Sequence, residues 1–232
     1  MLNFRSLTVA ASCMLVLAAC SSEPDKVEQA SSAGESAAPA QEAAAKPTGS
    51  LLQTGFGQRD EYVSVVALVK NTSAKVGQTV TVQFNVTDAA GEILGSESQV
   101  EYFSRPDQVL PVLTQVDVSG KKAAKVEATL LVEDNGTFDS EPFPEIPAKA
   151  TIAKSEYGDG YTARVQVSNP KAEPLKNPHI TVVCYDAAKK IVGGGFTFPD
   201  MIPPSGKAVA QVDLLTAGKP ARCDAYGTPS AI

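Results

Sequence analysis

Two stretches of the chain decide the fold: residues 69–95, VKNTSAKVGQTVTVQFNVTDAAGEILG, and residues 167–193, VSNPKAEPLKNPHITVVCYDAAKKIVG. A shift of 98 positions aligns all 27 residues of the first with the second without a gap. A repeat of this length indicates two copies of one structural unit. The identical pairs are Val69/Val167, Asn71/Asn169, Ala74/Ala172, Asp88/Asp186, Ala89/Ala187, Ala90/Ala188, Ile93/Ile191 and Gly95/Gly193.

The repeated unit is rich in strand-forming residues. Short runs of Val, Thr, Ile and Phe alternate with clusters of Gly, Asn, Asp and Pro, and no window has a helical period. This pattern predicts an all-β chain with two tandem immunoglobulin-like β-sandwich domains. We place the first sandwich at residues 51–140, a proline-rich linker at 141–154 and the second sandwich at 155–232.

The alignment extends beyond the quoted stretches with small changes of shift. At a shift of 96, Gln115–Val116–Asp117 lies on Gln211–Val212–Asp213. At a shift of 97, Val126 lies on Cys223. The two copies are therefore expected to share their later strands as well.

The N-terminus has the features of an export signal. The start MLNFR is positively charged, and the apolar run that follows it is too short to span a bilayer. The run ends in Leu17–Ala18–Ala19–Cys20, which resembles the bacterial lipobox. We predict a lipoprotein signal peptide at 1–19 and a lipid on Cys20. The alternative is an ordinary secretory cleavage that leaves Cys20 free.

Residues 20–50 join this signal to the repeats. The segment consists almost wholly of Ala, Ser, Glu, Pro, Lys, Gln and Gly, and it has too little apolar surface to offset its ordering entropy. We predict a disordered tether. The lipid on Cys20 would then be the membrane anchor, holding the protein on the outer face of a bacterial cell membrane.

The charge of the chain bears on its partners. The formal net charge is −6, with 20 basic and 26 acidic residues. A nucleic-acid-binding protein requires clustered Lys and Arg, so we expect no nucleic acid partner.

Four cysteines occur in the sequence, and the exported part retains Cys184 and Cys223 in an oxidising setting. Cys184 aligns with Val86 and Cys223 with Val126, so two thiols replace two β-branched core residues. Strand alternation places each thiol on the core face of its strand. We predict a disulfide between Cys184 and Cys223. An inert buried thiol is the next interpretation of Cys184.

Catalytic and metal-binding roles for Cys184 have weaker support. The single histidine, His179, has opposite strand parity to Cys184, so it cannot serve as the base of a thiol nucleophile. Zinc would require several Cys and His ligands at close spacing, so we expect no metal site and no cofactor. We predict that His179 is a surface strand residue. Gly193–Gly194–Gly195 predicts a bulge or a close backbone approach, and Phe196 and Phe198 are expected to pack in the core.

The two copies resemble a known domain family. The residues are Phe84–Asn85–Val86–Thr87–Asp88, Val182–Val183–Cys184–Tyr185–Asp186, the Asp-Ala-Ala turns and the strand ends KNTS and SNP. They are similar to FxLYD-type domains, small immunoglobulin-like sandwiches of bacterial envelope lipoproteins. The run from GFGQ to ALVKNTS resembles actinobacterial members. The resemblance covers nearly all of residues 51–228. It implies a fold and a location, and its motif contains no catalytic residue.

These observations favour a function without catalysis. We expect a binding or scaffolding module, no enzymatic activity, and another cell-envelope protein as the partner. The ligand-binding residues are unknown from the sequence. The alternative is an accessory receptor for a solute or polymer that serves a transporter or a wall enzyme. Phe196, Phe198 and Tyr226 lining one cleft would favour that alternative.

Overall fold

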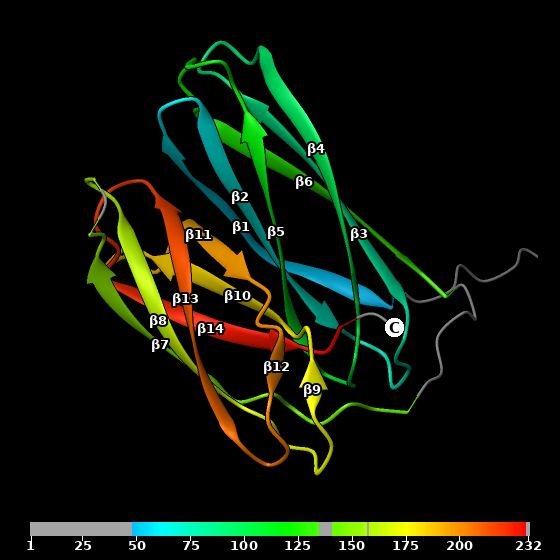
Figure 1. The fold of residues 1–232 in the computed structure, drawn as a ribbon. Coiled ribbons are helices and arrows are strands. Elements are labelled where there is room, and N and C mark those ends of the chain that lie inside the picture. Colours follow the sequence, from blue (N-terminus) through cyan, green and yellow to red (C-terminus); the bar gives the residue numbers. More distant parts are fainter. Residues whose placement is uncertain (1–47, 135–140, 157, 231–232) are drawn as a thin grey trace, which may run out of the picture. The chain divides into compact units, whose positions relative to one another are not determined.

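The computed structural model describes residues 48–134, 141–156 and 158–230, and these residues form strands and loops without a helix (Figure 1). The all-β prediction is confirmed. Within these ranges there is accordingly no apolar helix that could cross a membrane. The predicted signal peptide, Cys20 and nearly all of the predicted tether lie outside the described residues.

Fourteen strands make up this part of the chain. Six belong to the first sandwich: β1 (Gly49–Arg59), β2 (Tyr62–Asn71), β3 (Thr79–Thr87), β4 (Ile93–Tyr102), β5 (Val109–Asp117) and β6 (Lys125–Glu133). Eight belong to the second: β7 (Ala148–Lys154), β8 (Tyr161–Ser168), β9 (Leu175–Lys176), β10 (His179–Tyr185), β11 (Ile191–Thr197), β12 (Met201–Ile202), β13 (Lys207–Thr216) and β14 (Arg222–Thr228).

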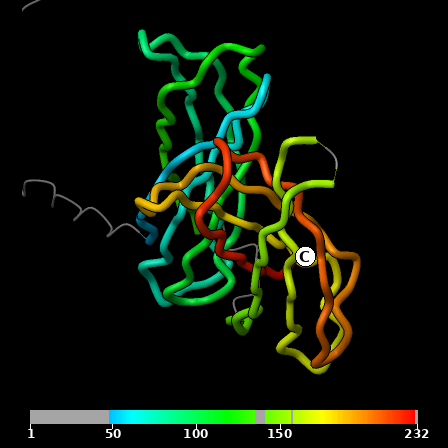
Figure 2. The backbone as a smooth tube through the Cα atoms, turned by 90° about the vertical axis from the view of Figure 1, so that its left-hand side faces the viewer, coloured from blue at the N-terminus to red at the C-terminus, as the bar shows by residue number. Residues whose placement is uncertain are grey.

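Each sandwich is built around two antiparallel three-stranded layers, and the backbone trace shows the strands of each sandwich lying side by side (Figure 2). In the first sandwich the layers are β1-β2-β5 and β4-β3-β6. The second repeats this order as β7-β8-β13 and β14-β10-β11, and a short β11–β13 pairing joins its layers into one six-stranded sheet. Its remaining strands, β9 and β12, pair with each other as a separate two-stranded sheet. Alternate residues of facing layers fill a separate hydrophobic core in each sandwich.

The repeat appears as matching hydrogen bonds in the two copies. Asn71 is the last residue of β2 and Asn169 directly follows β8, and each side-chain Nδ2 donates to the carbonyl oxygen four residues later, at 2.8 Å and 2.7 Å. Asp88 and Asp186 each accept a backbone N–H four residues later, at 2.9 Å and 2.8 Å. The shared residues therefore fix the same turns twice.

The shift of 96 between later strands is wrong. In the first sandwich Val66 pairs with Leu113, and in the second Arg164 pairs with Gln211. Both pairs differ by 98 positions, so the alignment continues unchanged through β5 and β13. The shift of 97 for the last strand is confirmed, because Val86 pairs with Val126 as Cys184 pairs with Cys223.

The predicted linker at 141–154 also requires correction. Its second half is the strand β7, which pairs with β8 from Ala148 to Lys154. The three prolines, Pro142, Pro144 and Pro147, all precede this strand, so their lack of an N–H does not disturb its ladder.

A third apolar cluster joins the two sandwiches and forms what we call the seam: Val66, Leu68, Leu113, Val183, Tyr185 and Ile191. Val66 and Leu68 project from β2 on the side opposite the first core, and Val183 and Tyr185 project from β10 on the side opposite the second. β2 and β10 are therefore buried on both faces. The outer faces of layers β1-β2-β5 and β14-β10-β11 pack together.

The backbone approaches closely at the seam, where β1 contacts β11. A Cβ atom at Gly57 would overlap the carbonyl oxygen of Val192, so only glycine fits there. The side chain of Gln53 donates to the carbonyl oxygen of Lys189 at 3.0 Å. The seam thus combines apolar burial with polar contacts between residues distant in sequence.

Candidate binding site

The predicted disulfide is present in the second sandwich. Cys184 and Cys223 lie directly opposite each other on β10 and β14, with their Cα atoms 4.1 Å apart and a sequence separation of 39. Cys184 is fully buried among the apolar residues of the second core. The bond therefore acts as a structural link between two strands of one layer.

The glycines after this strand behave as predicted. The pairing of β10 with β11 shifts register between Cys184 and Tyr185, which marks a bulge. A Cβ atom at Gly194 would overlap the carbonyl oxygen of Val182. Gly193–Gly194–Gly195 thus provides both the bulge and the close backbone approach.

His179 does not lie on an open surface, so that prediction is wrong. Only 8% of His179 is exposed, because the outer face of β10 packs towards the first sandwich. Its Nδ1 lies 3.3 Å from Oε1 of Glu101 on β4, and its Nε2 lies 3.3 Å from the Thr181 hydroxyl. His179 and Glu101 therefore form a largely buried polar contact between the two sandwiches.

Phe196 and Phe198 also differ from the prediction, which placed them in the core. They are 41% and 56% exposed. The Phe198 ring stacks on the His179 ring with centroids 4.5 Å apart, and the Phe196 ring meets it edge-on at 5.5 Å. Phe196 on β11 and Phe198 just after it project on the same side of the sheet as the seam, beyond the part that the first sandwich covers.

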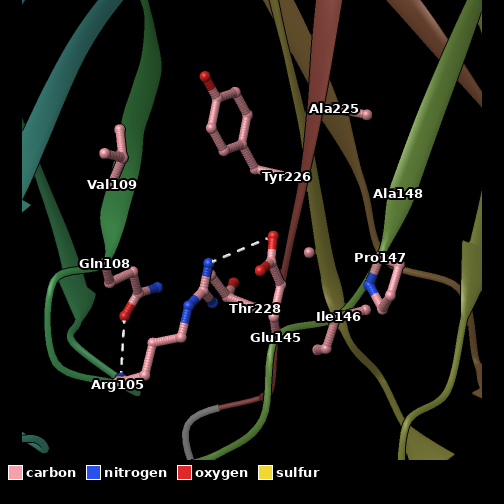
Figure 3. Close-up of a pocket in the computed structure, with 11 residues that line it drawn as sticks. Arg105, Gln108, Val109, Glu145, Ile146, Pro147, Ala148, Ala225, Tyr226 and Thr228 are labelled. Carbon is pink, nitrogen blue, oxygen red and sulfur yellow. Dashed lines mark hydrogen bonds and ion pairs between the residues drawn. The ribbon is translucent and has the colours of Figure 1, made fainter.

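A recess of about 210 Å³ opens where the β4–β5 loop of the first sandwich meets the end of β14 (Figure 3). Residues 145–148, which lead into β7 and include its first residue, form another wall. The guanidinium of Arg105 and the carboxylate of Glu145 point towards each other in it, with Nη2 and Oε1 3.8 Å apart. Tyr226 and Thr228 line the side formed by β14.

The loop that positions Arg105 is fixed by a buried glutamine. Gln108 is 2% exposed, and its Oε1 accepts the backbone N–H groups of Ser104 at 2.7 Å and Arg105 at 3.2 Å. The next segment is held as well, because the N–H of Phe143 donates to the carbonyl oxygen of Ser104 at 2.7 Å. The recess is therefore preformed by residues of both sandwiches.

The chemistry of the recess is that of recognition. Arg105 offers several N–H donors in one plane, which suit a carboxylate or a peptide carbonyl, and Glu145 offers acceptors. Pockets for drug-sized ligands typically enclose roughly 300–1,000 Å³. At about 210 Å³, the recess fits one or two side chains of a partner better than a whole small ligand.

A second, more open hollow of about 530 Å³ lies at another part of the boundary, near the β1–β2 turn. Arg59 and Asp60 line it from the first sandwich, and Tyr161 and Asp213 from the second. Across the described residues, no group of three or more His, Cys, Asp or Glu side chains is arranged to hold a metal ion.

Two phenols pair with each other: Tyr226, which lines the recess, and Tyr185 of the seam. Tyr185 is 3% exposed and hydrogen bonds to the hydroxyl of Tyr226, and burial raises the pKa of both phenols above their ordinary value near 10. The folded protein keeps these protons at a pH where unfolded tyrosine loses them. The contribution of the two phenols to the free energy of unfolding is therefore fully present below about pH 10 and is lost as the pH rises above it.

The Tyr185→Phe variant tests this dependence. Its free energy of unfolding should fall less steeply between about pH 10 and 11.5 than that of the wild type, because one titrating group has been removed. Denaturant titrations across this range measure the slope. Tyr62→Phe, at a side chain 47% exposed, is the control and should follow the wild type. Equal slopes for all three proteins would contradict the assignment.

Comparison with known proteins does not assign the chain to a family. No protein-family model matches the chain, and no curated protein matches it. Among solved structures, red sea bream transglutaminase is similar over 76% of this chain, with 14% identity and a TM-score of 0.24. The chain spans 29% of the length of that transglutaminase. A Bacillus subtilis oxalate decarboxylase is similar over 82% of this chain and 75% of its own, with 10% identity and a TM-score of 0.12.

Sequence reasoning found the disulfide and the glycine bulge but missed the recess. Of Phe196, Phe198 and Tyr226, only Tyr226 lines the recess, and neither phenylalanine lines it or the hollow near the β1–β2 turn. One signal was available, since the strands YVSVVALV and HITVVCY are apolar at both parities. Such runs are typical of strands buried on both faces.

Proposed function

We propose that this chain is a non-catalytic lipoprotein of the bacterial cell envelope, with tandem FxLYD-type domains that bind or scaffold another envelope protein. Cys20 would carry the lipid and hold the protein on the outer face of the cell membrane. Support for this location comes from the charged start, the short apolar run and the lipobox-like end of the signal.

The seam is the observation that carries the binding role. Interdomain contacts that are small and polar permit relative motion, whereas a buried apolar contact resists it. Here Val66, Val183 and Leu113 are almost fully buried between the sandwiches. The pair therefore presents the recess at Arg105 and Glu145 as a surface of fixed shape, which lowers the entropic cost of binding a partner.

One observation favours the alternative of a polymer receptor. Phe196 and Phe198 expose two rings beside His179, and exposed aromatic rings offer flat apolar surfaces to a ligand. Retention of the purified protein on cell-wall polymer, lost in Phe198→Ser and kept in Arg105→Ala, would support this alternative over a protein partner.

Replacing Cys20 tests the anchor. Cys20→Ala, or treatment of cells with globomycin, should move the protein from the membrane fraction to the soluble exported fraction, because the acyl chains would be lost. Fractionation with immunoblotting measures the shift, and Cys13→Ala, within the predicted signal peptide, is the matched control that should stay in membranes. Unchanged membrane retention of Cys20→Ala would refute the anchor.

Crosslinking in intact cells tests the partner. A photo-reactive amino acid at Glu145, whose side chain is 73% exposed, should capture an envelope protein that mass spectrometry then identifies. The same probe at Ala90, in the exposed β3–β4 turn, is the control for random contacts. Equal capture at both positions would contradict a binding role for the recess.

A further inference from the structure

The strand β6 has an open edge. It pairs with β3 over nine consecutive residue pairs, from Lys125 to Glu133, without a register shift. On its other side it pairs with no residue of 48–134, 141–156 or 158–230. A regular strand with a free row of N–H and C=O groups is a template for pairing with another chain.

The other edge strands of the first sandwich carry features that hinder pairing. β4 places Glu97 and Glu101 opposite Phe84 and Val80, so its charges lie on the interior side of the sheet. β5 contains Pro111 as its third residue, and proline has no N–H to donate. β1 has a register shift at Leu51 and packs against β11 and β13.

The outer strands of the second sandwich are also protected. Ile146 bridges to Gly227 and so covers one end of β14. β7 is a shorter edge strand of seven residues and carries Lys149 and Lys154. In β6, by contrast, the interior positions are all apolar, and the strand contains neither proline nor glycine. Among the described edges, β6 is the strand best suited to pairing.

The sequence of β6, KVEATLLVE, is complementary to itself in the antiparallel direction. A two-fold axis at Thr129 places Lys125 of each copy opposite Glu133 of the other, and Val126 opposite Val132. Ala128 then faces Leu130, so the interior row stays apolar across the junction. Opposite charges and apolar pairs that face each other across two strands both stabilise a sheet.

The outward-facing positions fit the same register. Glu127 comes to lie opposite Leu131, which is 52% exposed, and the aliphatic part of the glutamate can cover it. Lys125 already forms an ion pair with Glu127 of its own strand. In the paired state it lies between Glu127 of its own copy and Glu133 of the other.

We propose that two copies of this chain associate through β6, which joins their β4-β3-β6 layers into one continuous six-stranded antiparallel sheet. The contact is isologous and closes at two copies, because each β6 has a single open edge. The recess at Arg105 and the seam lie elsewhere in the fold, so this proposal is independent of the proposed function.

Cysteine crosslinking tests the register. In the dimer Thr129 faces its own counterpart, so Thr129→Cys in the full-length protein should form a disulfide between the two introduced thiols on mild oxidation, found by peptide mapping. Gln83→Cys is the control on the same face of β3. Its counterpart would lie three strand spacings away, roughly 14 Å, which is too far for a disulfide. Linkage in Thr129→Cys that is no faster than in Gln83→Cys would overturn the proposal.

Charge reversal tests the contact in solution. Sedimentation velocity of the purified full-length protein should show a dimer fraction that rises with concentration. Lys125→Glu and Glu133→Lys should each weaken the dimer about tenfold, since each change acts at two symmetric contacts. The double variant, Lys125→Glu with Glu133→Lys, should regain wild-type association.

Three outcomes would overturn this inference. The wild type could stay monomeric at all concentrations, as it would if another part of the chain or a different protein covers β6. The single variants could associate as strongly as the wild type. The double variant could remain as weak as the singles, which would refute the register. Circular dichroism confirms that each variant is folded.

Discussion

Replacing Val183 by aspartate should split the thermal unfolding of this protein into two transitions. Val183 is fully buried in the seam, and the seam places Leu113 of the first sandwich in the same cluster. A carboxylate there would lose its hydration without gaining an ionic partner, at a cost of several kcal/mol. The sandwiches would separate to hydrate it and then unfold one by one.

Calorimetry and limited proteolysis measure this effect. The wild type should unfold in one transition, and Val183→Asp in two, with new cleavage in the exposed seam. Leu113→Asp alters the seam from the first sandwich and should give the same pattern. Val209→Asp, at a side chain 56% exposed on β13, is the control. A single transition in both seam variants would show that the seam does not couple the sandwiches.

Removing the disulfide is the second change with a large expected effect. The double variant Cys184→Val, Cys223→Val should remain folded, because the first sandwich carries Val86 opposite Val126 at the same place. It should lose up to about 4 kcal/mol of unfolding free energy, since the bond closes a loop of 39 residues in the unfolded chain.

Reduction of the wild type provides the matched control. Dithiothreitol should lower wild-type stability to that of the double variant and leave the variant unchanged. Denaturant unfolding monitored by circular dichroism gives both values. A variant without β-structure would show that valines cannot replace the cysteines, and a variant as stable as the oxidised wild type would show that the link contributes nothing.

The parts of the fold that sequence reasoning predicted are those repeated in both copies. Asn71 and Asn169, the Asp-Ala-Ala turns and the core parity are shared, so the alignment located the strands and the disulfide. Within each copy these features depend on contacts between neighbouring strands. A period of two residues is sufficient to assign them to the core face.

The seam was missed because it depends on the positions where the copies differ. Val66 and Leu68 on β2 align with Arg164 and Gln166 on β8, and Asn85 on β3 aligns with Val183 on β10. These changes between polar and apolar side chains fall on every second residue, and therefore on one face of each strand. They would have marked the faces that pack together, and with them the burial of His179.

The recess could not be predicted from the sequence. Arg105 and Glu145 are brought together by a loop of one sandwich and a segment leading into the other. Their proximity depends on how the sandwiches dock, and no local period or spacing encodes it. The exposure of Phe196 and Phe198 has the same origin, because the first sandwich covers only part of the face from which they project.

The same differences between the copies bear on whether further domains could stack through contacts like the seam. The seam joins unlike faces, so a further domain could in principle add to either end and extend the chain into a fibre. In the second sandwich, the layer outside the seam carries Arg164 and Gln166 on β8. In the first sandwich, the corresponding layer carries the polar Gln83 and Asn85 on β3. Each requires hydration and resists burial. Burial of these side chains would be unfavourable, so they oppose a further contact of the seam type at either end.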